Sequence, residues 1–116
     1  MSITISITMS ERAPLSLDPE AWPIVASAKD WDGEHEFQAS RRYAVAVRRH
    51  ADGRSVVFGS YQSDYAGARG AAGGFLVPAG DASGVETARA IRRIAGIIQR
   101  PEIADLCIAD LPAEQI

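Results

Sequence analysis

The sequence has a single cysteine, Cys107, and only two histidines, His35 and His50. One cysteine excludes an internal disulfide and every zinc site that needs several cysteines. No apolar run approaches the roughly 20 residues that cross a bilayer. The first nine residues lack the basic start and continuous apolar block of a signal peptide. We therefore expect a cytoplasmic protein with no membrane partner, and we assign no residue to a metal, a cofactor or catalysis.

Length and composition are those of an ordinary globular chain. The protein has 116 residues and a mass of 12.4 kDa, with 47% hydrophobic and 23% charged residues. These proportions exclude a disordered or fibrous protein and supply enough apolar surface for one core. We expect a single domain over residues 1–116.

Lysine is almost absent, since all but one of the 12 basic residues are arginine, and the charges are sorted along the chain. Residues 1–40 carry a net charge of −5, residues 41–100 a net charge of +6, and residues 101–116 a net charge of −4. Arginine makes forked hydrogen bonds to carboxylates and phosphates, so this pattern favours recognition of another molecule. The other interpretation is coding bias, because a GC-rich gene enriches arginine without selection for binding.

Two segments of the first third have the pattern of strands. Residues 2–9 alternate strictly between apolar and hydroxyl side chains, which predicts a half-buried strand. Residues 18–20 offer a cap and a proline, but Pro23 limits any helix there to a single turn. Residues 23–29 predict a second strand, which ends at the turn-forming cluster of residues 30–36.

The alternation in residues 43–49 and 55–61, on either side of an Ala-Asp-Gly turn, predicts a β-hairpin. A three-residue loop with its glycine in the left-handed region places Val47 opposite Val57. In this register one face carries Tyr43, Val45, Val47, Val57 and Tyr61. A two-residue Asp-Gly turn would instead place Val47 opposite Phe58, so both registers stay open.

Glycine is concentrated in one segment. Residues 65–84 hold six of the ten glycines, and only Phe75-Leu76-Val77 within them resembles a strand. A glycine-rich loop can cradle a phosphate where it follows a strand and begins a helix. Residues 67–74 lead into a strand instead, and no Gly-Lys-Ser/Thr follows them. We therefore expect a mobile connection.

The last third of the chain has helical periodicity. Ser83 and Glu86 fit a capping box at the start of a helix, and Pro101 ends that helix and begins the next. The apolar stripe of the first helix consists of Ala88, Ile91, Ile94, Ala95 and Ile98. The stripe of the second helix consists of Ile103, Leu106 and Cys107. Strands first and helices last predict an α+β fold: an antiparallel sheet of four to five strands with two C-terminal helices packed on one face.

An acidic cluster lies in the predicted turn after the second strand and consists of Asp30, Asp32, Glu34 and Glu36. Clustered carboxylates suit calcium, but Gly33 is fourth in this segment, whereas an EF-hand loop needs glycine at its sixth position. The segment is therefore a solvated acidic turn or a contact for a basic partner.

The predicted hairpin is basic. It interleaves Tyr43 and Tyr61 with basic side chains, which is the composition of a β-ribbon that contacts phosphates. The basic residues are Arg41, Arg42, Arg48, Arg49, His50 and Arg54. An isoelectric point near 5.3 argues against a strongly basic nucleic-acid domain. The alternative is that these arginines pair with the acidic residues at 30–36 or in the last helix.

A second basic group lies on the first predicted helix, opposite its apolar stripe and around Gly96. Its members are Arg89, Arg92, Arg93 and Arg100. Forked hydrogen bonds from these guanidinium groups could fix the orientation of an acidic or phosphorylated partner. The group is otherwise a solvated helix face, since such stripes are common on amphipathic helices.

Catalysis has little support in the sequence. A nucleophile needs a base, and only His35 and His50 are available. His50 is expected at an exposed hairpin tip, where a dry site is hard to build. Cys107 falls on the apolar stripe of the last helix, where a cysteine is typically a small buried hydrophobe. We expect a protein that is not an enzyme.

Two segments, VRRHADGRSVVFG at residues 47–59 and CIADLPA at residues 107–113, are similar to uncharacterised small proteins of proteobacterial plasmids, prophages and integrative elements. These motifs are a hairpin turn and a helix end, and they carry over no catalytic residue. The resemblance implies a mobile-genome setting, which is shared with anti-CRISPR proteins and antitoxins.

The sequence thus predicts a non-enzymatic interaction protein that docks on a host protein or nucleoprotein complex through separate acidic and basic patches, as an anti-CRISPR-type inhibitor would. The alternative is a nucleic-acid-binding accessory factor that uses the basic hairpin of residues 41–54. An exposed sheet edge could also pair two copies into a homodimer.

Overall fold

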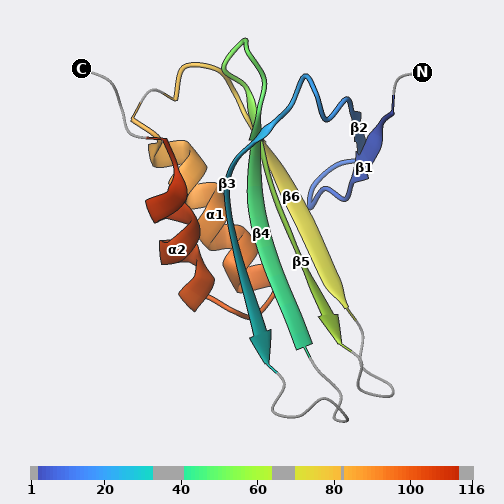
Figure 1. Ribbon diagram of the computed structural model, residues 1–116, viewed down its shortest axis with the longest axis vertical. Helices are drawn as coiled ribbons and strands as arrows, with labels where there is room; N and C mark the ends of the chain where they lie inside the picture. Colours follow the sequence, from blue (N-terminus) through green and yellow to red (C-terminus); the bar gives the residue numbers. More distant parts are fainter. Residues whose placement is uncertain (1–2, 33–40, 64–69, 82, 113–116) are drawn as a thin grey trace.

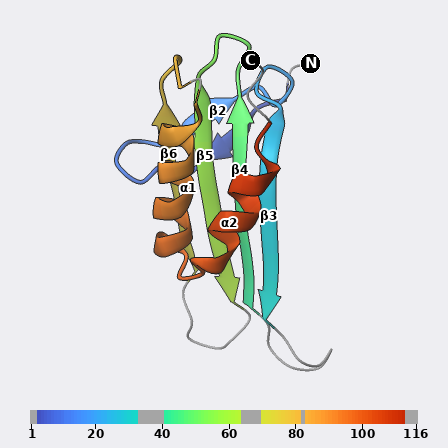
Figure 2. The same cartoon turned by 90° about the vertical axis from the view of Figure 1, so that its left-hand side faces the viewer.

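The protein is built in three layers (Figures 1 and 2). The computed structural model describes residues 3–32, 41–63, 70–81 and 83–112. A four-stranded antiparallel sheet forms the middle layer, two helices cover one of its faces, and a two-stranded hairpin covers part of the other. The predicted α+β fold, with both C-terminal helices on one face of an antiparallel sheet, is confirmed.

The central sheet follows the order of the chain. Its strands are β3 (Ile24–Asp32), β4 (Arg41–Arg49), β5 (Ser55–Ser63) and β6 (Ala71–Val77), each antiparallel to its neighbour. The helices are α1 (Val85–Ile97) and α2 (Glu102–Asp110). Helix α1 packs mainly on β5 and β6, and α2 packs mainly on β3. Figure 2 shows the two helices side by side in front of the sheet.

The β4–β5 hairpin has the first of the two registers that the sequence left open. Gly53 has a φ of 96°, and the His50 N–H donates to the Arg54 carbonyl oxygen at 2.9 Å. Val47 therefore lies opposite Val57 and Tyr43 opposite Tyr61. The glycine in the left-handed region closes a three-residue loop, as its missing Cβ permits.

The other strands differ from their predicted extents. The N-terminal strand is only β1 (Ile5–Ile7), and it pairs with an unpredicted strand, β2 (Leu15–Leu17). Strand β3 continues through Asp32, because Asp30 and Trp31 pair with Tyr43 and Arg42 of β4. The first part of the predicted acidic turn is therefore strand, and pairing with β4 outweighs its turn-forming composition.

Strand β6 begins at Ala71, within the segment that composition predicted to be a loop. Its glycines permit close packing. A Cβ on Gly74 would lie 2.8 Å from the Thr8 carbonyl oxygen, and a Cβ on Gly73 would lie 2.4 Å from Ser10 Oγ. Glycine here marks the close approach of the N-terminal segment to the sheet, so the prediction of a loop over these residues was wrong.

Two apolar cores lie on the two faces of the sheet. The main core is between the sheet and the helices, and includes Val45, Val47, Val57, Ile91, Ile94, Ile98, Ile103 and Cys107. The smaller core is under the β1–β2 hairpin and includes Ile7, Met9, Leu17, Trp22 and Val56. Leu106, which the helical period placed in the buried stripe, is 62% exposed instead, because α2 turns Ile103, Ala104 and Cys107 toward the sheet.

Helix α1 begins differently from the predicted capping box. Gly84 is the N-cap residue of α1, and glycine has no side chain that could cap the helix. Asp81 takes this role: its carboxylate accepts hydrogen bonds from the Glu86 N–H at 3.0 Å and from the Thr87 N–H at 2.8 Å. Thr87 is fully buried, and its hydroxyl also donates to Asp81, at 2.7 Å. The predicted pairing of Ser83 with Glu86 was therefore wrong.

We expect Asp81→Ala to lower the free energy of unfolding by about 1–2 kcal/mol, because it removes the cap and leaves the buried Thr87 groups unsatisfied. Partial burial raises the pKa of Asp81, but the hydrogen bonds from Thr87 and Glu86 outweigh it and hold the pKa below its ordinary value. A depressed folded pKa adds stability above the unfolded pKa of about 4. This contribution is lost as the pH falls through the folded value.

Urea denaturation of both proteins at pH 7 and at pH 3 measures this effect. The stability difference between wild type and Asp81→Ala should shrink at the lower pH. A difference that is equal at both values would show that the carboxylate charge adds nothing to the cap.

Each edge of the central sheet is covered at one point. On β3, the Ser27 N–H donates to the Asp110 carboxylate at the end of α2, at 2.9 Å. On β6, the Gly74 N–H donates to Ser10 Oγ at 3.1 Å, and the Ser10 N–H donates to the Gly74 carbonyl oxygen at 2.9 Å. Side chains and backbone from distant parts of the chain thus occupy groups that a further strand would need.

Candidate functional site

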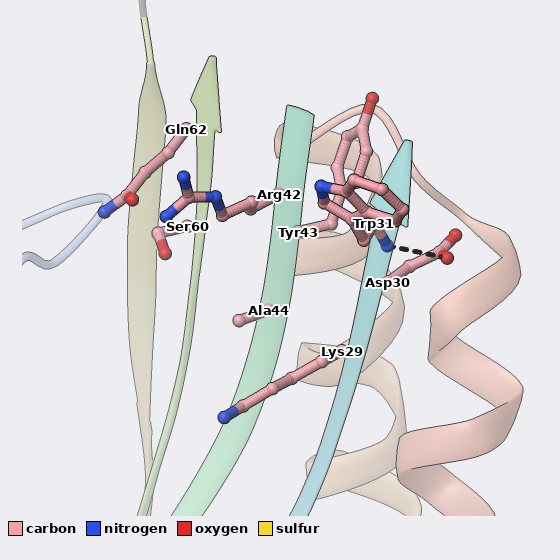
Figure 3. A pocket seen from close by; sticks show the side chains of 8 residues that line it. All are labelled: Lys29, Asp30, Trp31, Arg42, Tyr43, Ala44, Ser60 and Gln62. Atoms are coloured by element: carbon pink, nitrogen blue, oxygen red, sulfur yellow. Dashed lines mark hydrogen bonds between the residues drawn. The ribbon is translucent and has the colours of Figure 1, made fainter. Parts of the chain in front are cut away.

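The half of the sheet that lies beyond the β1–β2 hairpin carries a groove on the face away from the helices. No described helix or strand covers this half of the face (Figure 1). The groove is shallow and has a volume of about 580 Å³. Figure 3 shows the residues that line it: Lys29, Asp30, Trp31, Arg42, Tyr43, Ala44, Ser60 and Gln62. We call it the open-face groove.

Strand alternation and register explain which side chains line the groove. From Ala26 onward, even-numbered residues of β3 face the helices, as odd-numbered residues of β4 and β5 do, so the residues between them face outward. The register then aligns two rows across the three strands. One row is Trp31, Arg42 and Gln62, and the other is Lys29, Ala44 and Ser60.

Trp31 is the most prominent apolar side chain of the groove, with 55% of its surface exposed. Its position is fixed through the backbone. The Trp31 N–H donates to Asp30 Oδ1 at 2.8 Å, and Arg100 Nε donates to Asp30 Oδ2 at 2.7 Å. The hydrogen bond from Arg100, and next that from the Trp31 backbone, hold the pKa of Asp30 below its ordinary value. Asp30 thus ties the Trp31 end of β3 to the segment between α1 and α2.

The sheet behind the groove is well packed. Tyr43 and Tyr61 stack with their ring centres 5.2 Å apart, and the Arg100 guanidinium lies 4.9 Å from the centre of the Tyr43 ring. These contacts are on the helix side of the sheet, as the register requires. The groove therefore lies on a supported platform and not on a loop.

The outward face is basic. Lys29 and Arg42 reach across the sheet from their strands toward β5 (Figure 3), and Arg48 lies on the same face nearer the hairpin. Among the described residues of β3 to β6 that face outward, none is acidic. Asp30 lies at the rim of the groove, but its carboxylate accepts a hydrogen bond from Arg100 on the helix side of the sheet.

A smaller cavity of about 250 Å³ continues from the groove under the β1–β2 hairpin, since Ala44 and Ser60 line both. Arg48 also lines this cavity and donates from Nη1 to the Trp22 carbonyl oxygen at 2.9 Å. Its Nε is buried and has no hydrogen-bond partner among the described residues. Arg48, predicted as a partner contact, therefore lies partly beneath the β1–β2 hairpin.

The two other hairpin arginines are bonded locally. Arg54 pairs with Asp52 at 2.8 Å, and its guanidinium lies 5.2 Å from the centre of the Trp22 ring. Arg49 Nε donates to Ser55 Oγ at 2.9 Å. Arg49 pairs with Ser55 beside the β4–β5 turn, whereas Arg42 pairs with Gln62 at the other end of the two strands. The predicted basic ribbon is therefore divided: Arg42 lines the open-face groove, and Arg49 and Arg54 lie at the turn.

All four arginines predicted as the helix stripe bond to carboxylates of the same chain. The pairs are Arg89 with Glu86 at 2.6 Å, Arg92 with Asp105 at 3.0 Å, Arg93 with Glu11 at 3.1 Å and Arg100 with Asp30 at 2.7 Å. Arg93 also lies 4.0 Å from the centre of the Phe75 ring. The opposite charges of the helix layer are therefore interleaved, in contrast to the predicted separate patches.

The predicted acidic cluster is described only at its start. Asp30 is on the helix side and pairs with Arg100. The backbone of Asp32 ends β3, whereas its side chain, Glu34 and Glu36 lie outside the described residues. The prediction of an acidic contact surface at Asp30, Asp32, Glu34 and Glu36 therefore stays a prediction, with Asp30 already engaged.

Cys107 and His50, the two described side chains with potential as nucleophile or base, are both engaged in packing. Burial raises the pKa of the Cys107 thiol to about 11, with a further contribution from the charge of Asp110. His50 packs on Trp22 with ring centres 5.0 Å apart, and its Nδ1 lies 3.2 Å from the Asp52 carboxylate. Within the described residues, no three side chains of His, Cys, Asp or Glu come together as a metal site. No helix in those residues is long and apolar enough to cross a membrane.

Sequence reasoning missed the groove residues Lys29, Trp31 and Gln62, whereas Arg42 was predicted as part of the basic hairpin. The sequence of β3 nevertheless contains a pattern that could have indicated an exposed face. After Ile24, the outward positions of β3 are Ser27, Lys29 and Trp31, so this part of the strand has no aliphatic residue on that face. A strand that alternates small apolar residues inward with polar or aromatic residues outward has one face in contact with solvent or with a partner.

Comparisons with models of protein families, with curated proteins and with solved structures gave no match for this chain.

Proposed function

We propose that the protein is a non-catalytic interaction module that docks on a macromolecule through the open-face groove. The observation that supports this most is the half-exposed Trp31, held on a supported sheet beside Lys29 and Arg42. Tryptophan and arginine are the residue types most enriched where binding energy concentrates. An exposed tryptophan on a rigid face is thus a good anchor for a partner.

The shape of the site favours a large partner over a small one. Pockets for small ligands bury most of the ligand surface, whereas this groove lies on a part of the sheet that none of the described helices or strands covers (Figures 1 and 3). Its lining crosses three adjacent strands. A polymer or a protein surface can follow such a face, and a small molecule would stay largely in solvent.

The docking residues differ from those that the sequence favoured. Exposed ion pairs are worth little to stability, so the helix arginines could exchange partners at low cost. Each nevertheless has a carboxylate of its own chain in contact, which a partner would have to replace. The groove requires no such exchange at Trp31, and we assign the principal contact to it.

Affinity capture from the organism that carries the gene tests this proposal. Immobilised wild-type protein, Trp31→Ala and Leu106→Ala are exposed to the same lysate, with and without nuclease. Leu106 is the matched control, because it is a large apolar side chain, 62% exposed, on the opposite layer. We expect a specific partner that the Leu106→Ala protein retains and the Trp31→Ala protein loses. Equal capture by all three proteins would overturn the assignment to the groove.

The finer hypothesis, an anti-CRISPR-type inhibitor of the mobile genome acting in the cytoplasm, stays a prediction supported by the sequence resemblance. A plasmid-interference assay in a host with an active CRISPR system measures it. Expression of the wild-type protein should restore plasmid transformation, and expression of Trp31→Ala should not. Unchanged interference in every CRISPR type examined would contradict it.

A further inference from the structure

We propose that the occupant of the open-face groove is a single-stranded nucleic acid, with a base stacked on Trp31 and neighbouring phosphates bound by Lys29 and Arg42. This inference rests on the proposed docking function and names the chemistry of its partner. It uses the face of the sheet and not the tip of the basic hairpin.

The first support is the stacking surface. Every unpaired base has a π-face, so an exposed aromatic ring on a rigid platform binds bases with little dependence on sequence. Trp31 has 55% of its surface exposed. The two hydrogen bonds through Asp30 fix the adjacent backbone. The backbone that carries the ring is therefore already ordered, and stacking of a base has to order only the two side-chain torsions of Trp31.

The second support is the charge of the face. Lys29 and Arg42 reach over the sheet from two adjacent strands (Figure 3), and none of the acidic side chains that the structure describes on β3, β4 and β5 faces outward beside them. Asp30 follows Lys29 in the sequence, and its bond to Arg100 holds its carboxylate on the helix side. An anionic backbone is therefore the occupant with complementary charge.

The third support is the arrangement of polar and small side chains between these groups. Gln62 extends the row of Trp31 and Arg42, and Ser60 extends the row of Lys29 and Ala44. The amide and hydroxyl groups can hydrogen-bond to base edges, and Ala44 lets a base come close to the sheet. Both rows cross the strands, so they give a path for an extended chain.

The dimensions agree with a short single strand. Strands are about 4.8 Å apart, so the three strands that line the groove span about 10 Å. Sheets that stack two or three bases use several aromatic residues, and Trp31, the one exposed aromatic residue among the described lining residues, provides a stacking surface for one base. A duplex would hide its bases from Trp31 and would need an element that enters a groove, which a flat face lacks. We therefore expect a preference for single strands over duplexes.

The salt dependence follows from the two cations. Neutralising one phosphate of a single strand changes the slope of log K against log salt by about −0.7. Lys29 and Arg42 together therefore give a slope of about −1.4. The net charge of the whole chain is −3, so binding depends on stacking as much as on charge.

Fluorescence anisotropy with labelled 12-nucleotide single strands of DNA and RNA, and with the matching duplexes, tests the inference at 20 mM to 200 mM salt. We expect Trp31→Ala to weaken binding by about 5- to 150-fold and Trp31→Phe to retain most of it. Lys29→Ala and Arg42→Ala should each reduce the salt slope by about 0.7. The controls are Leu106→Ala and Arg92→Ala, which change an exposed apolar and an exposed basic side chain on the helix layer. Both should bind as the wild type does.

Each result has a distinct meaning. Absence of binding to any single strand at 20 mM salt overturns the inference. If Trp31-dependent capture of a protein from nuclease-treated lysate persists in that case, the proposed docking function stands and its partner is a protein. If no Trp31-dependent partner is captured either, both proposals fail. Binding that is lost equally in Arg92→Ala and Arg42→Ala would also overturn the inference, because it would show unspecific attraction to arginine.

Discussion

Ile94→Ala is expected to lower the free energy of unfolding by about 4 kcal/mol. Ile94 lies in the main core with none of its surface exposed. It packs over the backbone of β5 and β6 at two glycines, where a Cβ on Gly59 would lie 2.4 Å from Ile94 Cγ2. Because Gly59 and Gly73 carry no side chains, the sheet offers no side chain at these two positions that could move into the cavity. The loss therefore falls in the upper part of the range for such a substitution.

Chemical denaturation of the wild type, Ile94→Ala and Ile97→Ala measures this prediction. Ile97 is the matched control, an isoleucine of the same helix with 38% of its surface exposed. We expect a loss of about 1 kcal/mol there, because less apolar surface leaves water on folding. Domains of this size are stable by only about 5–15 kcal/mol, so Ile94→Ala removes a large share. Similar losses at both positions would contradict the packing described for α1.

Gly59→Ala is expected to destabilise the protein by about 2–3 kcal/mol, although it only adds one methyl group. The new Cβ would lie 2.4 Å from Ile94 Cγ2 and 2.7 Å from the Ala44 carbonyl oxygen. The backbone of β4 cannot move away without breaking its pairing with β5. Helix α1 must therefore lift from the sheet, and the main core loses contacts.

Gly96→Ala is the control for this substitution. A Cβ there meets nothing within 4 Å, and alanine is the better helix former, so we expect a gain of about 0.5–1 kcal/mol. Thermal or urea unfolding of the two variants should change in opposite directions. In Gly59→Ala/Ile94→Ala the two losses should sum to more than the measured total, since the smaller residue 94 relieves one of the clashes. Strict additivity would show that residues 59 and 94 do not contact each other.

The parts of the fold that were predictable from sequence are those fixed by local chemistry. The turn at Gly53 sets the β4–β5 register through a backbone angle that favours glycine. The period of Ile91, Ile94 and Ile98 sets the buried face of α1 without any knowledge of the sheet. In both cases neighbouring residues carry the whole signal.

The parts that were missed depend on contacts between distant segments. Gly73 and Gly74 lie in a strand because residues 8–10 pass close to it, and composition alone indicates a loop. Asp81 reaches across the turn before α1 to cap it, which a fixed capping spacing does not anticipate. Leu106 fits the helical period but lies on the exposed side of α2.

The candidate site was predicted least well, for a similar reason. Charge counts drew attention to arginines that proved to pair with carboxylates of the same chain, such as Arg92 with Asp105. The importance of Trp31 depends on which half of the sheet the N-terminal hairpin leaves uncovered, and that follows from the packing of Trp22 and Leu17. Alternation shows that Trp31 and Lys29 share a face, and only the tertiary fold shows that no described helix or strand covers that part of it.

The hydrogen bonds at the two margins of the sheet bear on self-association. A second copy that aligned with β3 would compete with the Asp110 carboxylate for the Ser27 N–H, and one that aligned with β6 would compete with Ser10 for Gly74. Strand exchange and fibre growth both begin with such lateral alignment. Lateral alignment of a second copy must therefore displace a bond at each margin, whereas the half of the flat face that no described helix or strand covers presents its side chains without such competition.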